Sequence, residues 1–375
     1  MSDSIISAIR DELAKVSDPE LHRPITELGM VERIEFKDGV ADVSILLTIT
    51  GCPMRDRLKK DVSEAVLKVT SVKSMNVSFG VMNEEQRDYV KKLLRGGREK
   101  FIPFAQPDSL TRVIGISSGK GGVGKSSVTV NLAVSLASRG FKVGLLDADV
   151  YGHSIPRALG IEGKRPTAID QTFIPLEAYG VKTVSIEMFK PDRADPVAYR
   201  GPLLHRVLEQ LLSDAYWGDL DFLLLDLPPG TGDIAISLGQ LIPNSEIIVV
   251  TTPQVAAAEV AERAGRIAHQ LKQQIIGVIE NMSAYEIPGS NEKVALFGEG
   301  GGEETAKRLS MLVGADVPLL GKIPFDIALR EGGDEGRPIV VSNPESSATK
   351  AIESVIDQLT LRKKSLLGVP LGIIT

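Results

Sequence analysis

The sequence is poor in cysteine, because Cys52 is the only one among 375 residues. A single thiol cannot close a disulfide within the chain, so disulfide-stapled folds are excluded and nothing indicates an oxidising compartment. Histidine is also scarce, and none of the four is at metal-ligand spacing to another or to the cysteine. We therefore interpret the histidines as structural or solvent-facing: His22, His153, His205 and His269.

The sequence also lacks an excess of positive charge and any long apolar run. Lys and Arg total 43 against 49 Asp and Glu, and a net charge of -6 argues against a large nucleic-acid-binding surface. No apolar stretch approaches the roughly 20 residues of a membrane-spanning helix. Residues 1–16, MSDSIISAIRDELAKV, mix acidic and basic side chains and indicate an amphipathic helix rather than a signal peptide. We expect a soluble cytoplasmic protein that binds neither nucleic acid nor membrane.

Residues 1–95 have the pattern of a small α+β domain. Apolar residues recur on one side of a predicted helix at Ile5–Val16. The stretch VERIEFKDGVADVSILLTIT predicts a β-hairpin with Asp38-Gly39 as its turn. A helix after Cys52-Pro53, a strand (KSMNVSFGV) and a charged helix at Glu84–Leu94 complete the predicted domain.

A different pattern begins after residues 96–110, which are predicted to be a linker because they hold two glycines and two prolines without a clear period. From residue 111 to 362 short apolar runs alternate with longer helical segments. Such runs predict an α/β domain with a parallel sheet buried on both faces, which binds ligands at the carboxyl ends of its strands. The apolar runs of this domain are RVIGIS, KVGLLD, FLLLD, EIIVVTT, QIIGVIE and VPLLGKI. Residues 363–375 are predicted to be a C-terminal tail that docks on the protein.

A phosphate-binding loop is the strongest motif of the sequence. GKGGVGKS, Gly119 to Ser126, fits G-x-x-x-x-G-K-[ST] and lies between a predicted strand and a predicted helix, as the motif requires. Its glycines let several backbone N–H groups face one phosphate, while Lys125 reaches the β- and γ-phosphates and the Ser126 hydroxyl binds Mg²⁺. A glycine-rich turn without a ligand is the alternative. The predicted ATP-binding residues here are Gly119, Lys120, Gly121, Gly122, Val123, Gly124, Lys125, Ser126 and Ser127.

Lys120 is a second lysine that an ordinary phosphate-binding loop does not need. A cation near the γ-phosphate would stabilise the charge that develops there during hydrolysis. The residue alone also allows a solvated surface lysine. We therefore predict a catalytic role for Lys120 beside Lys125 and keep the surface lysine as the alternative.

Carboxylates follow two of the predicted strands. VGLLDADVYG ends a predicted strand with Asp147 and Asp149, and FLLLDLPPGTGD ends another with Asp226, which a Pro/Gly loop and Asp233 follow. A carboxylate at a strand end beside the phosphate loop is suited to hold Mg²⁺, and a second one can orient the attacking water. We assign Asp226 to Mg²⁺ and Asp149 to water activation, with Asp147 in support. Helix caps or turns are the alternative interpretation of these aspartates.

The K-G-G-V-G-K-S sequence resembles the deviant P-loop ATPases, which include MinD, ParA, the nitrogenase iron protein and the Mrp/ApbC proteins. The resemblance to Mrp/ApbC, the nucleotide-binding iron–sulfur cluster carriers, extends from residue 118 to 302. It implies an ATP-bound homodimer in which Lys120 acts on the partner's nucleotide. It also implies that Asn281 contacts the adenine with Pro324 nearby, and it makes Gln254 a further candidate. The motifs are SGKGGVGKSSVTVNLA, LLDADVYGHSIPRALG, YRGPLL, WGDLDFLLLDLPPGTGD, TTPQ, GVIENMS and FGEGGG.

The first domain supports the same family. DPEL, ITELGMV and LLTITGCPM resemble the small domain that is fused to many of these carriers and found in other iron–sulfur assembly factors. The implied fold class is a parallel-sheet deviant P-loop NTPase domain preceded by a small α+β domain.

One departure from the family concerns the cluster ligands. The carriers usually hold a C-x-x-C pair between ENMS and FGEGGG, where this chain has Ile287, Pro288, Gly289 and Ser290. A four-iron cluster ordinarily takes four thiolates, and a dimer of this chain offers only two, both from Cys52. Pro53 suits the first turn of a helix, which would place Cys52 near the N-cap, where the positive helix end favours a thiolate. A buried core cysteine is the alternative.

The sequence supports three hypotheses for the function to different degrees. The first is a slow, dimer-dependent ATPase that binds and transfers iron–sulfur clusters to apoproteins, or assists their assembly. The second is a MinD/ParA-like positioning or scaffolding ATPase without a cluster, against which the negative net charge and the fused first domain argue. Nitrogenase-like electron transfer is a third function, which the lack of cluster cysteines disfavours.

Overall fold

The computed structural model describes residues 2–49, 54–94, 101–106, 108–149, 152, 154–169, 172–189, 201–230, 232–287, 290 and 292–361. Cys52 and the predicted C-terminal tail lie outside these residues, as do residues 96–100 and 107 of the predicted linker. The chain divides into two compact units. Unit 1 comprises Met1–Phe101 and Pro166–Ile174, and unit 2 comprises Ile102–Arg165 and Pro175–Thr375.

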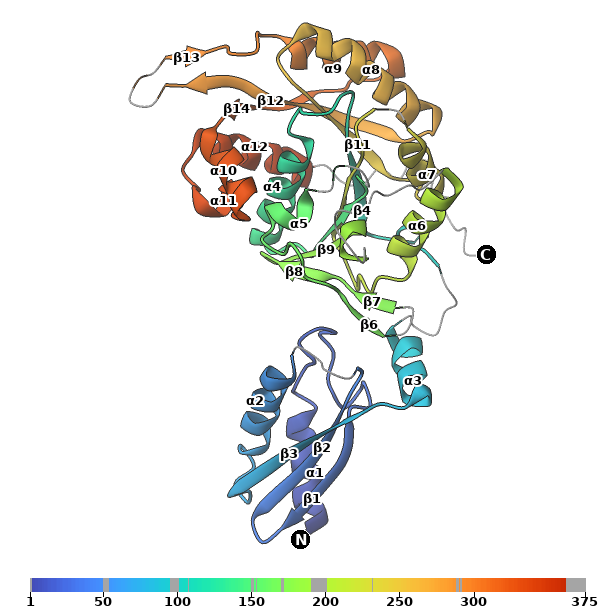
Figure 1. Ribbon diagram of the computed structural model, residues 1–375, viewed down its shortest axis with the longest axis vertical. Helices are drawn as coiled ribbons and strands as arrows, with labels where there is room; N and C mark the ends of the chain where they lie inside the picture. Colours follow the sequence, from blue (N-terminus) through green and yellow to red (C-terminus); the bar gives the residue numbers. More distant parts are fainter. Residues whose placement is uncertain are drawn as a thin grey trace. The chain divides into compact units, whose positions relative to one another are not determined.

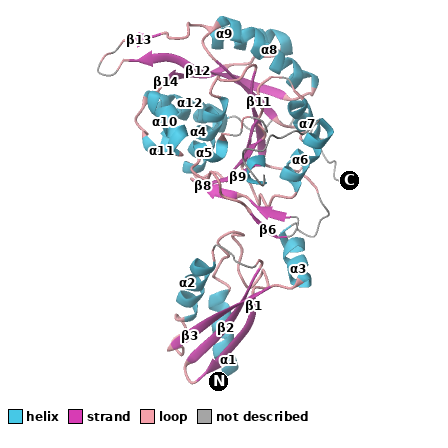
Figure 2. Ribbon diagram, viewed as in Figure 1, coloured by secondary structure: helices cyan, strands magenta, loops and turns pink. Residues whose placement is uncertain are grey.

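Unit 1 is an α+β unit with a three-stranded sheet in the order β1-β2-β3 (Figures 1 and 2). The predicted hairpin is confirmed, since β1 and β2 pair antiparallel around Asp38-Gly39, and both turn residues have the positive φ that such a tight turn requires. The sheet's third strand, β3, pairs parallel with β2. The elements of unit 1 within residues 2–94 are α1 (Ser2–Leu13), β1 (Val31–Lys37), β2 (Val40–Leu47), α2 (Arg55–Val66), β3 (Ser74–Val81) and α3 (Glu84–Leu94).

A short hairpin from the middle of the chain also belongs to unit 1. Its strands are β6 (Thr167–Ile169) and β7 (Thr172–Ile174), and the Thr167 hydroxyl donates a hydrogen bond to Glu20 Oε1 at 2.7 Å. Burial raises the pKa of the Glu20 carboxyl, and the hydrogen bond from Thr167 opposes that rise. The sequence pattern gave no reason to expect that residues within 111–362 would join the first unit.

Unit 2 is built on a nine-stranded sheet in the order β13-β12-β11-β4-β10-β5-β9-β8, with β14 paired to β12 (Figure 1). The predicted apolar runs form β4, β5, β10, β11, β12 and β14, which pair with one another only in parallel. The strands are β4 (Arg112–Ser118), β5 (Val143–Asp147), β8 (Leu176–Ala178), β9 (Val181–Ser185), β10 (Phe222–Asp226), β11 (Glu246–Thr251), β12 (Gln274–Glu286), β13 (Lys293–Val294) and β14 (Leu319–Phe325). The sequence did not predict β8 and β9, or β13, which pairs antiparallel with β12.

Helices cover both faces of this sheet, which keeps its continuous apolar strands away from water (Figures 1 and 2). One group contains α4, α5, α10, α11 and α12, and the other contains α6, α7, α8 and α9. None of the described helices is long and apolar enough to cross a membrane. Their bounds are η1 (Pro103–Ala105), α4 (Lys125–Ser138), α5 (Ile155–Ala158), η2 (Ile186–Phe189), α6 (Gly201–Ser213), α7 (Asp233–Leu241), α8 (Val255–Gln270), α9 (Gly301–Val313), α10 (Ile327–Glu335), α11 (Ile339–Ser342) and α12 (Ser347–Leu361).

A buried ion pair joins the starts of two central strands. Arg112 opens β4 and Glu246 opens β11, and their Nη2 and Oε2 atoms lie 2.8 Å apart with both side chains about nine-tenths buried. Arg112 also donates through Nη1 to the carbonyl of Leu359 in α12 at 2.6 Å, and its guanidinium lies 5.5 Å from the ring centre of Phe222. The pair thus ties two strands and the last helix together at the edge opposite the strand ends that carry the site.

Candidate nucleotide-binding site

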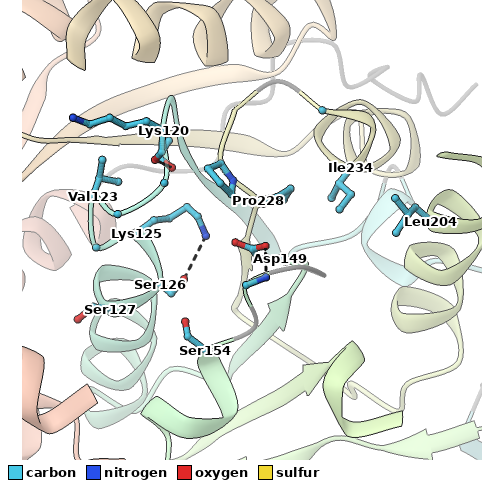
Figure 3. Close-up of a pocket in the computed structure, with 17 residues that line it drawn as sticks. Lys120, Val123, Lys125, Ser126, Ser127, Asp149, Ser154, Leu204, Pro228 and Ile234 are labelled. Carbon is cyan, nitrogen blue, oxygen red and sulfur yellow. Dashed lines mark hydrogen bonds between the residues drawn. The ribbon is translucent and has the colours of Figure 1, made fainter. Parts of the chain in front are cut away.

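The predicted phosphate loop connects β4 to α4 and borders a cavity of about 870 Å³ (Figure 3). All of its predicted residues except Gly119 line this cavity. Gly122 and Gly124 have φ values of 79° and 78°, which other residues rarely adopt. A Cβ on Gly124 would also lie 2.3 Å from Asn281 Nδ2. Two glycines of the motif are therefore required by backbone conformation, and one of them by close packing as well.

The end of β10 places Asp226 directly beneath the start of α4. Lys125 Nζ lies 2.7 Å from Asp226 Oδ1, and both side chains are buried. The Ser126 hydroxyl donates to Asp226 Oδ2 at 2.6 Å, and the Thr129 hydroxyl donates to Oδ1 at 2.8 Å. The Ser126 hydroxyl and the Asp226 carboxylate thus present adjacent hard oxygen donors, which are the ligands that Mg²⁺ prefers. Thr129 was missed, although its position one helical turn after Lys125 and Ser126 places it on the same face.

Asp147 and Asp149 face different surroundings because β5 ends at Asp147. Asp147 is fully buried and does not line the cavity, whereas Asp149 does. Burial, and secondly the negative charge of Asp226, raises the pKa of the Asp147 carboxyl well above its ordinary value, although the Ser185 hydroxyl donates to it at 3.0 Å. Asp149 Oδ1 accepts the Gly152 N–H at 3.0 Å. Of the two aspartates, Asp149 therefore lines the cavity and Asp147 does not, while the roles assigned to them stay predictions.

Asp233 is the first residue of α7, which follows the Pro/Gly loop after β10. Its side chain lies outside the described part of the chain. The neighbouring residues Pro228, Pro229 and Ile234 line the cavity wall.

Lys120 lines the same cavity but turns its amino group away from the phosphate loop. Figure 3 shows its side chain running away from Lys125 and Asp149. Its Nζ donates to Gln254 Oε1 at 2.8 Å. Lys120 is therefore hydrogen-bonded to another side chain at the surface, and both its catalytic role and the surface-lysine alternative stay predictions.

A second cavity of about 370 Å³ is lined by Asn281 and Pro324. It shares Gly124, Ser127 and Ser154 with the first cavity, so the two adjoin. Asn281 Nδ2 donates to the Val123 carbonyl at 2.9 Å, whereas the buried Oδ1 has no hydrogen-bond partner. A buried acceptor of this kind indicates a ligand with a matching donor. Gln254, the further candidate from the family resemblance, lines neither cavity.

The region of the expected cluster ligands lies between β12 and β13. Ile287 accepts a hydrogen bond from the Ser290 N–H at 3.0 Å and donates its own N–H to Glu292 at 3.1 Å. Pro288 and Gly289 lie outside the described residues. Among the residues that the structure describes, no group of three or more His, Cys, Asp or Glu side chains could hold a metal ion.

The helix after Cys52 begins later than predicted. α2 starts at Arg55 with Met54 as its N-cap, so the prediction that places Cys52 near the N-cap is wrong by two residues. A proline is tolerated before a helix as well as in its first turn, and Pro53 therefore does not determine the first helical residue. Cys52 itself lies outside the described residues.

Comparison with known proteins matches both parts of the chain to families named for iron transfer or iron–sulfur cluster assembly. A family model described as NUBPL iron-transfer P-loop NTPase matches residues 109–360, and a model for iron–sulfur cluster assembly proteins matches residues 6–79. The chain is 56% identical to a Mycobacterium tuberculosis protein named iron–sulfur cluster carrier protein, over 98% of this chain and 96% of the relative. An Escherichia coli protein of the same name is 34% identical, over 95% of this chain and 92% of the relative.

A solved structure agrees with this fold. The structure is a nucleotide-binding protein from Archaeoglobus fulgidus in complex with ADP, and it is 34% identical to this chain with a TM-score of 0.53. The match covers 65% of this chain and 96% of that protein.

Proposed function

The chain belongs to the family of iron-transfer P-loop NTPases described as NUBPL-type, and on this premise we propose that it is an ATP-hydrolysing homodimer that carries iron–sulfur clusters to apoproteins. Full-length relatives named iron–sulfur cluster carrier protein support the carrier role. The chain's own residues support the ATPase part of the proposal most strongly.

One observation carries the ATPase proposal, namely the set of contacts around Asp226. Lys125 and Ser126 both contact this carboxylate at the base of the phosphate loop, and Asp149 lines the cavity that the loop borders. We assign Lys125 to the β- and γ-phosphates, Ser126 and Asp226 to Mg²⁺, and Asp149 to the attacking water. Bound Mg²⁺ supplies charge neutralisation at the phosphates.

We propose that turnover is slow because one chain alone does not complete the site. Lys120 points away from its own phosphate loop, so its ammonium is not placed to stabilise charge on its own nucleotide. A second copy of the chain would supply the missing cation. A full site would then exist only in the ATP-bound dimer.

In this proposal the cluster is cargo rather than a resident cofactor, and few of its ligands come from the chain itself. Each chain contributes one thiol, Cys52, so a homodimer offers two. A cluster held by them needs further ligands from an outside thiol or from cysteines of the client apoprotein. We propose that such incomplete ligation makes the chain a transfer protein rather than a storage site.

Anaerobic reconstitution with iron and sulfide is expected to give the wild-type protein visible iron–sulfur absorption in the presence of a small thiol. Cys52→Ala is expected to lose that absorption, and the bound iron and sulfide with it, because no other thiol exists in the chain. Iron and sulfide analysis after gel filtration measures both. Unchanged ATP affinity is the control for folding. A wild-type protein without a cluster whose Cys52→Ala variant still matures client apoproteins would overturn the carrier proposal.

Asn281 is expected to select adenine through its free Oδ1, which suits the N6 amino group as a donor. Asn281→Leu should weaken ATP binding by about tenfold, since the hydrogen bond and the buried acceptor are both lost. Inosine triphosphate has an oxygen in place of the amino group and is the matched comparison. Equilibrium binding should show that the wild type prefers ATP over inosine triphosphate and that the variant does not. An equal preference in both proteins would contradict this assignment.

A further inference from the structure

Lys120 and Gln254 meet because two neighbouring strands end side by side. Lys120 follows β4 and Gln254 follows β11, and these strands pair in parallel with Val250 opposite Ser118. Both residues therefore leave the sheet at the same edge, although 134 positions separate them in the sequence. Their hydrogen bond, 2.8 Å from Nζ to Oε1, links the phosphate loop to the start of α8.

The backbone on each side of this contact is held by further hydrogen bonds. The Ser118 hydroxyl donates to the Lys120 carbonyl at 3.1 Å. On the other side the Pro253 carbonyl accepts the Gly301 N–H at 2.9 Å, and a Cβ on Gly301 would lie within 2.7 Å of that same carbonyl oxygen. The first turn of α9 thus packs directly on the residue before Gln254. The contact joins two positioned backbones rather than two mobile loops.

The contact also determines where the Lys120 charge lies. Figure 3 shows the side chain leaving the cavity on the side away from Asp149. Within the cavity Lys125 is the lysine paired with Asp226. The Lys120 ammonium is therefore kept off its own phosphate site while Gln254 holds it.

We propose that Gln254 is a positioning residue whose neutral amide holds Lys120 in the resting chain and releases it when a second copy brings a nucleotide phosphate within reach. This inference rests on the proposed ATP-dependent homodimer. The hydrogen bond to an uncharged amide is weak compared with the attraction between an ammonium and a triphosphate, so the phosphate wins the competition. A carboxylate at the same position would compete far better.

Two substitutions at Gln254 should therefore change self-association in opposite directions. Gln254→Leu removes the acceptor at similar volume and is expected to tighten self-association with Mg²⁺ and a non-hydrolysable ATP analogue by about fivefold. Gln254→Glu retains the contact, adds a charge and repels the incoming phosphate, and is expected to weaken it by about tenfold. Sedimentation equilibrium of the full-length chain measures both. Loss of a merely structural contact would weaken association in both variants.

Two controls isolate the effect. Gln270→Glu places the same new charge at the exposed far end of α8 and should leave association unchanged. In a Lys120→Ala background, Gln254→Leu should have no effect, because the side chain that it releases is gone. The inference would be overturned if both Gln254 variants shifted association in the same direction. It would also be overturned if Gln254→Leu had the same effect in the Lys120→Ala background as in the wild type. Either result would leave the proposed dimer intact. A wild type that does not associate with the analogue would overturn the dimer, and the inference with it.

Discussion

Replacing Asp149 with asparagine is expected to slow ATP hydrolysis by about 10²- to 10⁴-fold, the range for loss of a general base. ATP binding should change little, because Asp149 contacts the Gly152 N–H and the cavity rather than the phosphate loop. Asparagine has nearly the same shape and can still accept that hydrogen bond, but it cannot take a proton from water. Single-turnover hydrolysis and equilibrium binding of ATP, measured on the same preparation, separate the two effects.

Asp147→Asn is the matched comparison, since it makes the same chemical change two residues earlier. Asp147 is fully buried, accepts the Ser185 hydroxyl and does not reach the cavity. The substitution is expected to slow hydrolysis by less than about tenfold, because Asp147 acts on the reaction only through its neighbours. If the two variants lost activity equally, the assignment of the water-activating carboxylate to Asp149 would fail.

Arg112→Met is expected to lower the free energy of unfolding of unit 2 by about 3–5 kcal/mol. The substitution leaves the Glu246 carboxylate buried without its cation and removes the hydrogen bond to the Leu359 carbonyl. Urea unfolding followed by tryptophan fluorescence suits this measurement. Trp217 is the only tryptophan of the chain and is buried in unit 2, so its signal reports on that unit alone.

Arg330→Met provides the contrast, because Arg330 pairs with Asp334 at the surface with 62% of its side chain exposed. Exposed pairs contribute about 0–1 kcal/mol, so the unfolding midpoint should barely move. Arg112→Met combined with Glu246→Leu should recover part of the loss, since no unpaired charge then remains buried. A double variant no more stable than Arg112→Met would show that the buried charge is not the cause.

Sequence reasoning predicted those parts of the site that depend on local order. The phosphate loop, Asp149 and Asp226 each follow a continuous apolar run, and a buried parallel strand brings such strand ends to one edge. The contact between Lys120 and Gln254 could not be predicted, because it requires β11 to lie beside β4 although β5 and β10 intervene in the sequence. The short strands β8 and β13 have too few residues for a period to emerge. The start of α2 was missed for a similar reason, because a proline permits several helix starts.

The hairpin formed by β6 and β7 has a consequence for how the chain is made. Unit 1 contains the N-terminus, yet it also contains Pro166–Ile174, so it cannot be completed until residue 174 has left the ribosome. Domains generally fold as units in the order of synthesis. Here the hairpin is synthesised only after β4, α4 and β5 of the second unit, so the part of unit 1 that Pro166–Ile174 supplies arrives late. A single cleavage of the chain near residue 101 would place Glu20 and its partner Thr167 on different fragments. The hairpin would then belong to the fragment that carries unit 2.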